Sequence, residues 1–136
     1  MKSFVLDCSV TMAWCFSDEA NECSDEALRL LKNSKAVVPS VWSLEVINVL
    51  RTCERKNRIN TAQSNTFIQL LNALPIEIDV NQNELPNKNI LEISRKYSIS
   101  AYHAAYLELS LRRNIPLISF DKILCEAAEK AGISLQ

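Results

Sequence analysis

Three acidic residues, Asp7, Glu45 and Asp121, stand where a carboxylate can take part in chemistry. Asp7 ends the apolar run "SFVLD", and Asp121 directly follows "PLISF", so both acids come at the ends of predicted buried strands. Glu45 lies within "VWSLEVINVL", which is apolar at seven of its ten positions and predicts a largely buried helix. Because a buried carboxylate is costly unless it is paired, hydrogen-bonded or bound to metal, Glu45 in particular needs a partner.

The three acids together predict a site for a divalent cation. Ligands of open parallel sheets bind outside the carboxyl ends of the strands, where Asp7 and Asp121 should meet in one crevice. Clustered carboxylates repel one another, and Mg²⁺ or Mn²⁺ relieves this repulsion. A cation held in this way activates water and stabilises charge on a phosphoryl group, which favours phosphodiester hydrolysis as the reaction. Two alternatives stay open: Asp7 and Asp121 as helix N-caps, and Glu45 in a salt bridge with arginine or lysine.

Composition excludes several other classes of function. Gly132 is the only glycine, so neither kind of glycine-rich nucleotide-binding loop can be present. The net charge of −1 provides no overall field that attracts nucleic acid. Five cysteines without CxxC spacing predict reduced thiols in a cytoplasmic protein. No apolar run approaches the ~18 residues of a membrane span, and Asp7 interrupts the apolar N-terminal stretch, so neither a signal peptide nor a membrane partner is expected.

The elements that position these acids alternate between strands and helices. Apolar and alternating runs predict strands over 3–7, 36–38, 75–80, 116–120 and 133–135, with 75–80 toward an edge of the sheet. Helical periodicity and capping residues predict helices over 20–33, 40–56, about 61–74, 88–97, 101–113 and 121–131. The alternation predicts a single three-layer α/β/α domain over 1–136, with a central, mainly parallel sheet of four to five strands.

Four blocks of the sequence, in order, resemble the PIN-domain ribonucleases, and most closely the VapC-type toxins of bacterial toxin–antitoxin pairs. The blocks are "FVLDCSV", "VVPSVWSLEVINVL", "SISAYHAAYLELS" and "IPLISFDKILCEAAEKAGI". The resemblance implies a Mg²⁺- or Mn²⁺-dependent endoribonuclease on a PIN-like fold, with RNA as its substrate. It also implies a homodimer and a cognate antitoxin that inhibits the enzyme by threading a segment toward the acidic pocket.

The resemblance also assigns roles to individual residues. It implies a catalytic and metal-binding set made of Asp7, Glu45, His103 and Asp121. Polar residues of the same blocks that would support this set are Ser9, Asn48 and Ser119.

His103, the only histidine, stands where the third block usually has an acid. The exchange removes one negative charge and adds an imidazole, which suits Mn²⁺ or later transition metals better than Mg²⁺. With Ser100 as the N-cap, His103 lies in the positive first turn of its helix, which disfavours imidazolium, whereas the nearby acids favour it. Three roles therefore stay open: a neutral metal ligand, an imidazolium that replaces the cation, or a hydrogen-bonded histidine in a partly buried pocket.

The contrasting hypothesis is a degenerate PIN domain that binds RNA or an antitoxin without cutting. A third interpretation is a cysteine–histidine hydrolase that uses Cys8 with His103. Strand alternation argues against it, because this alternation aims Cys8 away from Asp7.

Basic and aromatic residues provide weaker signals. Candidate phosphate contacts are Arg51, Arg55, Lys56 and Arg112, although such charges more often belong to a solvated helix end. Tyr102 and Tyr106 lie one helical turn apart and are expected to be packing residues.

Overall fold

A parallel β-sheet forms the centre of the molecule. The computed structural model describes residues 3–80 and 85–135. The strands within these ranges are β1 (Ser3–Leu6), β2 (Lys35–Pro39), β3 (Ile76–Asp79) and β4 (Leu117–Ile118). They lie in the order β3-β2-β1-β4, and every neighbouring pair is parallel. This confirms the predicted parallel sheet and the edge position of the third strand.

Two strand predictions at the C-terminal end of the chain were too long. β4 has two residues rather than the five of "PLISF", because the chain turns at Ser119 to begin the last helix. The predicted strand over 133–135 is a single bridge between Leu117 and Leu135.

Seven helices surround the sheet in the described part of the chain. They are α1 (Cys8–Ala13), α2 (Glu22–Leu30), α3 (Val41–Arg55), α4 (Thr61–Ala73), α5 (Leu85–Tyr97), α6 (Ala101–Arg113) and α7 (Lys122–Lys130). Capping side chains begin four of them, as Asn21, Asn60, Ser100 and Asp121 each accept a hydrogen bond from the backbone N–H three residues later. α6 has the predicted bounds, because its N-cap and its C-terminal Asn114 in the left-handed conformation are both local signals.

Helix α1 was not predicted. Its six residues include Val10 and Thr11, which favour strands, and it is too short to display helical periodicity. Burial of five of its six residues overrides these local preferences.

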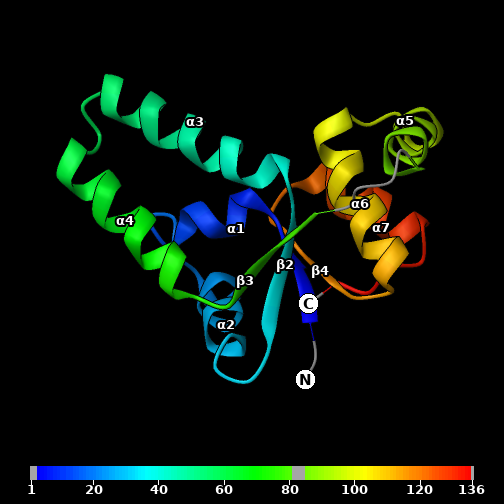
Figure 1. Ribbon diagram of the computed structural model, residues 1–136, viewed down its shortest axis with the longest axis horizontal. Coiled ribbons are helices and arrows are strands. Elements are labelled where there is room, and N and C mark those ends of the chain that lie inside the picture. Colours follow the sequence, from blue (N-terminus) through cyan, green and yellow to red (C-terminus); the bar gives the residue numbers. More distant parts are fainter. Residues whose placement is uncertain (1–2, 81–84, 136) are drawn as a thin grey trace.

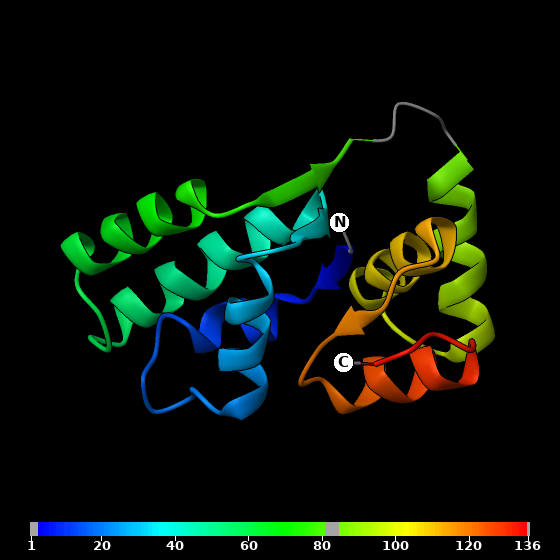
Figure 2. The same ribbon diagram turned by 90° about the horizontal axis from the view of Figure 1, so that it is seen from below.

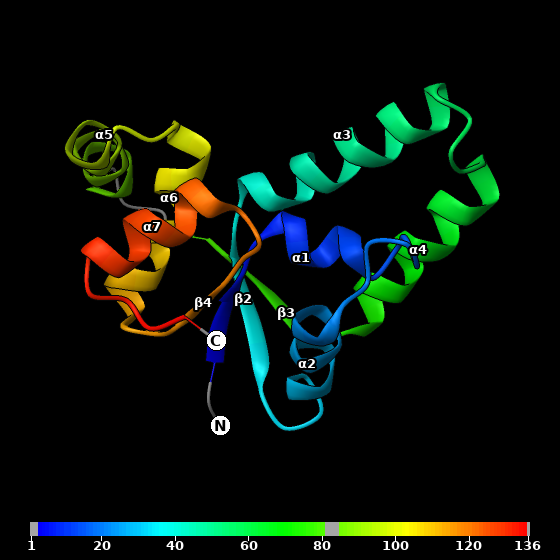
Figure 3. The ribbon, with the colours of Figure 1, turned by 180° about the vertical axis from the view of Figure 1, so that it is seen from behind.

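The helices form two groups, one on each side of the sheet. α1, α2, α3 and α4 lie on one side, and α5, α6 and α7 lie on the other, as the three views agree (Figures 1, 2 and 3). α3 and α4 diverge from the loop that joins them and extend beyond the sheet (Figure 1). The arrangement is the predicted three-layer α/β/α architecture. None of the helices in the described ranges is long and apolar enough to cross a membrane.

The core lies where β1 and β2 meet the inner faces of the helices, and α6 contributes buried Tyr106, Leu107 and Leu109. The prediction that α3 is buried almost all round was wrong. Its buried residues follow helical spacing along one side, whereas Leu44 and Ile47 are 68% and 50% exposed. The reason is that α3 packs with one face on α1 and β2, so its opposite face has no packing partner among the described elements.

Ion pairs fasten the edge strand β3 to the end of α6. Arg112 and Arg113 both donate to the Asp79 carboxylate, with N–O distances of 2.6 and 2.7 Å. Arg112 also donates to buried Glu108, and Arg113 pairs with Glu77. Burial raises the pKa of the Asp79 carboxyl, but the hydrogen bonds from the two arginines outweigh burial and hold that pKa below its usual value.

Asp79→Asn should therefore destabilise the fold in a pH-dependent way. The folded-state pKa of Asp79 is lower than the unfolded aspartate pKa of about 3.9, so ionised Asp79 stabilises the fold fully at pH values above about 3.9. This stabilisation is lost as the pH falls through the folded-state pKa. At neutral pH we expect the free energy of unfolding to fall by about 1–3 kcal/mol. Urea unfolding of both proteins at neutral and acidic pH measures the difference, which should shrink in acid. Glu92→Gln, which neutralises an exposed acid on α5, is the control. A pH-independent difference would contradict this account.

Candidate active site

Asp7 is the most buried acid of the candidate site, with 5% of its surface exposed. It follows β1, and its Oδ2 accepts hydrogen bonds from the hydroxyls of Ser9 and Ser119, both at 2.7 Å. In the described ranges no lysine or arginine pairs with this carboxylate. Its charge is thus stabilised by two neutral donors on one oxygen, an arrangement suited to a carboxylate that also binds a cation.

The backbone around Asp7 is fixed by the start of α1. The Asp7 carbonyl accepts from the backbone N–H of Val10 and Thr11 and from the Thr11 hydroxyl. The indole N–H of Trp42 on α3 then donates to Thr11 Oγ1 at 3.0 Å. Asp7 occupies the N-cap position of α1 but makes no side-chain capping bond, so the N-cap alternative for its carboxylate was wrong.

The two serines that bind Asp7 also join the ends of β1 and β4. Ser9 Oγ accepts from the backbone N–H of Phe120 at 3.1 Å, and Ser119 Oγ accepts from that of Asp121 at 2.9 Å. Each hydroxyl donates to Asp7 and accepts from the loop that carries Asp121. The predicted meeting of Asp7 and Asp121 at the carboxyl ends of their strands therefore has a direct structural basis.

Asp121 has two roles at once. Its Oδ1 accepts from the backbone N–H of Leu124 and so caps α7, which bears out the N-cap alternative for this residue. Its Oδ2 lies 3.2 Å from His103 Nε2. The backbone N–H of His103 donates to Ser100 Oγ, which confirms the predicted position of His103 in the first turn of its helix.

Glu45 approaches the crevice from α3. Its Oε1 accepts from the hydroxyl of Tyr106 on α6 at 2.6 Å. Burial, the largest influence, raises the pKa of the Glu45 carboxyl, and the nearby Asp7 carboxylate raises it further. The hydrogen bond from Tyr106 and the nearby His103 both lower this pKa. Glu45 is therefore near enough to Asp7 and His103 for their charges to act on the pKa of its carboxyl. Among the described residues no arginine or lysine pairs with Glu45, so the salt-bridge alternative was wrong.

The donor types in the crevice fit a divalent cation, since they are carboxylate oxygens and one imidazole nitrogen. As the side chains stand, however, no group of three or more His, Cys, Asp or Glu residues within 3–80 and 85–135 could hold a metal ion. The chemistry of the donors therefore matches a cation, whereas the described side chains are not gathered closely enough to hold one as they stand.

Comparison with protein families decides the identity of this fold. The family model of the PIN domain matches residues 4–130. The chain belongs to the PIN-domain family. PIN nucleases generally depend on divalent metal ions, which agrees with the donor types of the crevice.

Solved structures with the same fold include several complexes. This PIN domain is similar to a VapBC2 structure from Rickettsia felis bound to a promoter DNA fragment, with a TM-score of 0.71, 12% identity, and coverage of 98% of this chain and 97% of that chain. It is also similar to VapBC-1 from nontypeable Haemophilus influenzae (TM-score 0.68, 16% identity, 98% and 96% coverage). A third is a toxin–antitoxin complex from Klebsiella pneumoniae (TM-score 0.61, 12% identity, 86% and 85% coverage). At these identities the likeness concerns the fold alone. Comparison with curated proteins gave no match.

Cys8 does not have the properties of a nucleophile in this PIN domain. It begins α1 rather than continuing the strand, so the alternation argument does not apply to it. Burial raises the pKa of its thiol to about 12, and the nearby Glu45 and Asp7 carboxylates add to the shift. The thiol is therefore protonated at neutral pH, which argues against the cysteine–histidine hydrolase.

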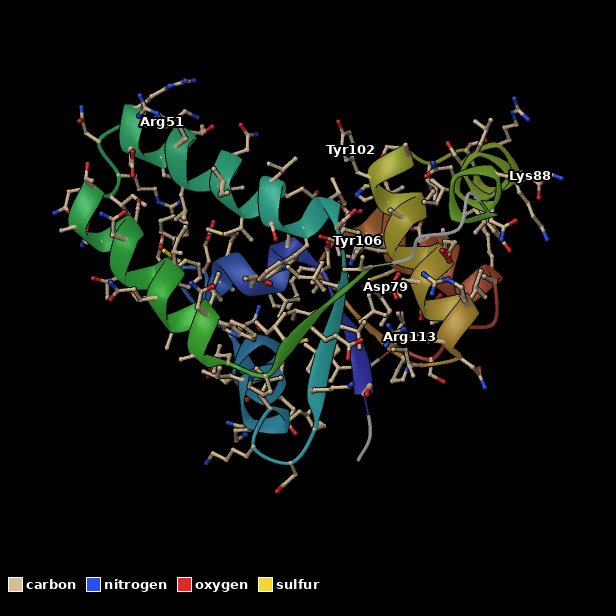
Figure 4. The ribbon with its side chains drawn as sticks, viewed as in Figure 1. Arg51, Asp79, Lys88, Tyr102, Tyr106 and Arg113 are labelled. Carbon is tan, nitrogen blue, oxygen red and sulfur yellow. The ribbon has the colours of Figure 1, made fainter. Side chains whose placement is uncertain are left out.

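The other predicted residues lie at the edges of the site or away from it. Asn48 is exposed on α3. Arg51, near the far end of α3 (Figure 4), pairs with Glu54, and Arg112 is engaged by Asp79 and Glu108. Arg55 and Lys56, at the C-terminal end of α3, have exposed side chains. A role of these residues in RNA binding stays a prediction.

Tyr106 was predicted to be a packing residue, and its contact with Glu45 was missed. Tyr106, on α6 (Figure 4), does pack in the core, yet its hydroxyl also binds Glu45 on α3. Its spacing of three residues from His103 was an available signal, because residues three apart share a helix face.

Ser119→Ala should weaken the join between β1 and the Asp121 loop. The substitution removes a donor to the buried Asp7 carboxylate and an acceptor for the Asp121 backbone, and we expect the free energy of unfolding to fall by about 1–3 kcal/mol. Urea unfolding measures the loss. Ser40→Ala is the matched control, because this exposed serine also follows a strand but makes no side-chain capping bond. Equal losses in the two variants would contradict a specific role for Ser119.

Proposed function

We propose that this PIN domain is a divalent-metal-dependent endoribonuclease that hydrolyses RNA phosphodiester bonds. The observation that carries the proposal is the buried Asp7 carboxylate, which has no basic partner among the described residues and meets the Asp121 loop at the carboxyl ends of β1 and β4. Glu45 on α3 lies near enough to Asp7 and His103 for their charges to act on it, and His103 on α6 contacts Asp121. Membership of a family of nucleases supports the same reaction.

The cation would be held by Asp7, Glu45, Asp121 and His103. When bound, it would supply an activated water and charge stabilisation on the phosphoryl group. The chain's own residues orient the ligands: Ser9 and Ser119 hold Asp7, and Tyr106 holds Glu45. Exposed Asn48 would contact the RNA or its hydration shell beside Glu45.

The ion would be Mn²⁺ in preference to Mg²⁺. Mg²⁺ prefers oxygen ligands in octahedral geometry, and imidazole suits the later divalent ions. His103 Nε2 lies 3.2 Å from Asp121 Oδ2, so an imidazole nitrogen and a carboxylate oxygen would both be available to hold the ion.

The biological role that we propose is that of the toxin in a toxin–antitoxin pair, acting in the cytoplasm as a homodimer of single-domain chains. The fold is shared with structures that are described as VapBC or toxin–antitoxin complexes. The antitoxin would inhibit by threading a segment toward His103 and Asp121, whose side chains are 25% and 34% exposed.

A catalytically degenerate PIN domain is the second candidate. Two observations favour it: His103 contacts Asp121 directly, and no three metal-binding side chains among the described residues are gathered into one group. In this case the imidazole takes the place of the cation, and the domain binds RNA or an antitoxin without cutting.

RNA cleavage by the purified protein separates the two candidates. A pool of structured RNAs is incubated with the protein as given, with His103→Asp and with Asp7→Asn, in Mg²⁺ and separately in Mn²⁺. We expect the protein as given to cut better in Mn²⁺, His103→Asp to shift the preference toward Mg²⁺ because it restores an oxygen ligand, and Asp7→Asn to lower the rate by about 100-fold or more because the buried ligand charge is lost.

The outcomes have distinct meanings. Cleavage by His103→Asp alone identifies a nuclease that is silenced at one position and supports the degenerate domain. Cleavage that survives Asp7→Asn would contradict the proposed metal site.

A further inference from the structure

We infer that Tyr106 is a positioning residue whose hydroxyl restricts the rotamers of the Glu45 carboxylate and thereby strengthens its binding to the cation. The inference rests on the proposed function and concerns a contact that no motif of the sequence predicts. Tyr106 would not touch the cation or the RNA; it would act through Glu45.

The contact joins two elements that are remote in sequence. Tyr106 Oη lies 2.6 Å from Glu45 Oε1, and the two residues are 61 positions apart. Tyr106 comes from α6 and Glu45 from α3, two helices on opposite sides of the sheet. A phenol can donate one hydrogen, and an ionised carboxylate can only accept, so the direction of the bond is determined.

The two partners differ in how firmly the rest of the structure holds them. Tyr106 has no exposed surface and packs among core residues, so its ring has a fixed position. Glu45 is half-buried and follows exposed Leu44, and Tyr106 is its one hydrogen-bond partner among the described side chains. A rigid donor therefore orients a carboxylate that would otherwise choose among several rotamers.

The same helix supplies the ligand that departs from the family pattern. His103 lies three residues before Tyr106, and its helix is capped by Ser100. α6 thus presents an imidazole toward Asp121 and a hydroxyl toward Glu45. Because His103 brings no negative charge, cation binding depends on the three remaining carboxylates, and a disordered Glu45 would cost more than in a site with four acids.

A merely structural role would predict something different. Tyr106 would then satisfy its own buried hydroxyl by bonding to Glu45, and loss of the hydroxyl would lower the stability of the fold without changing cation affinity in the folded protein. Cation affinity measured on folded protein therefore distinguishes positioning from packing.

The experiment compares Mn²⁺ affinity of the full chain with that of Tyr106→Phe, measured from the electron paramagnetic resonance signal of free Mn²⁺. Tyr106→Phe removes the hydroxyl and keeps the ring. We expect affinity to fall by about 10–100-fold, the usual cost of losing a hydrogen bond to a metal ligand. Tyr102→Phe is the matched control, since Tyr102 is 60% exposed one turn earlier on the same helix, and its affinity should not change.

A double-mutant cycle tests whether Tyr106 acts through Glu45. In a Glu45→Gln background, Tyr106→Phe should cause no further loss of Mn²⁺ affinity. An equal loss in both backgrounds would overturn the inference, because Tyr106 would then act on the fold as a whole.

A second variant tests the contact without altering the core. Glu45→Asp keeps the charge but withdraws the carboxylate by one methylene both from the Tyr106 hydroxyl and from the cation, so we expect a loss of about 10–100-fold, to which Tyr106→Phe in the same chain should add little. Wild-type affinity in Glu45→Asp or in folded Tyr106→Phe would overturn the inference.

RNA cleavage in the same samples separates this inference from the proposed function. If the wild type binds Mn²⁺ without cutting and Tyr106→Phe binds it more weakly, the positioning role stands and the nuclease proposal fails. If the wild type binds and cuts while Tyr106→Phe is unchanged in both, the nuclease proposal stands and the positioning role fails. A wild type that does not bind Mn²⁺ overturns both.

Discussion

The site depends on one constraint, the burial of the Asp7 carboxylate at the end of β1 without a basic partner among the described residues. A buried charge of this kind needs hydrogen-bond donors, and the structure supplies them from Ser9 and Ser119. The same two hydroxyls accept from the loop that carries Asp121, so satisfying one acid also determines where the other lies. The start of α1 and the Thr11–Trp42 bond then secure the backbone of Asp7.

The parallel sheet explains how such distant residues come together. β1 and β4 are neighbours in the sheet and point the same way, so their carboxyl ends open at one edge, and Ser119 reaches Asp7 across 112 positions of sequence. α3 follows β2 and brings Glu45 to this edge. α6 packs on the sheet from the other side and brings His103 and Tyr106.

His103 changes the electrostatic character of this edge. In place of a further carboxylate, an imidazole lies against Asp121, which already caps α7. The site therefore has less negative charge to attract a cation and a donor of a different kind. The charge of Asp79 on the edge strand is treated differently, because two arginines pair with it and fasten α6 to β3. Acidic side chains therefore have basic partners where they stabilise the fold, and at the candidate site they have no lysine or arginine partner among the described residues.

The sequence by itself determined the α/β class, the parallel sheet, the bounds of α6 and the PIN resemblance, and it identified Asp7, Glu45 and Asp121 as the candidate acids. These features are recorded locally, in apolar runs, caps and motif spacing. Only the tertiary structure decided that α1 is a helix, that α3 is buried on one face, that Asp121 contacts His103 and that Tyr106 holds Glu45. The physical reason is that burial and side-chain contacts depend on which elements pack together, and no local pattern specifies a partner 61 residues away.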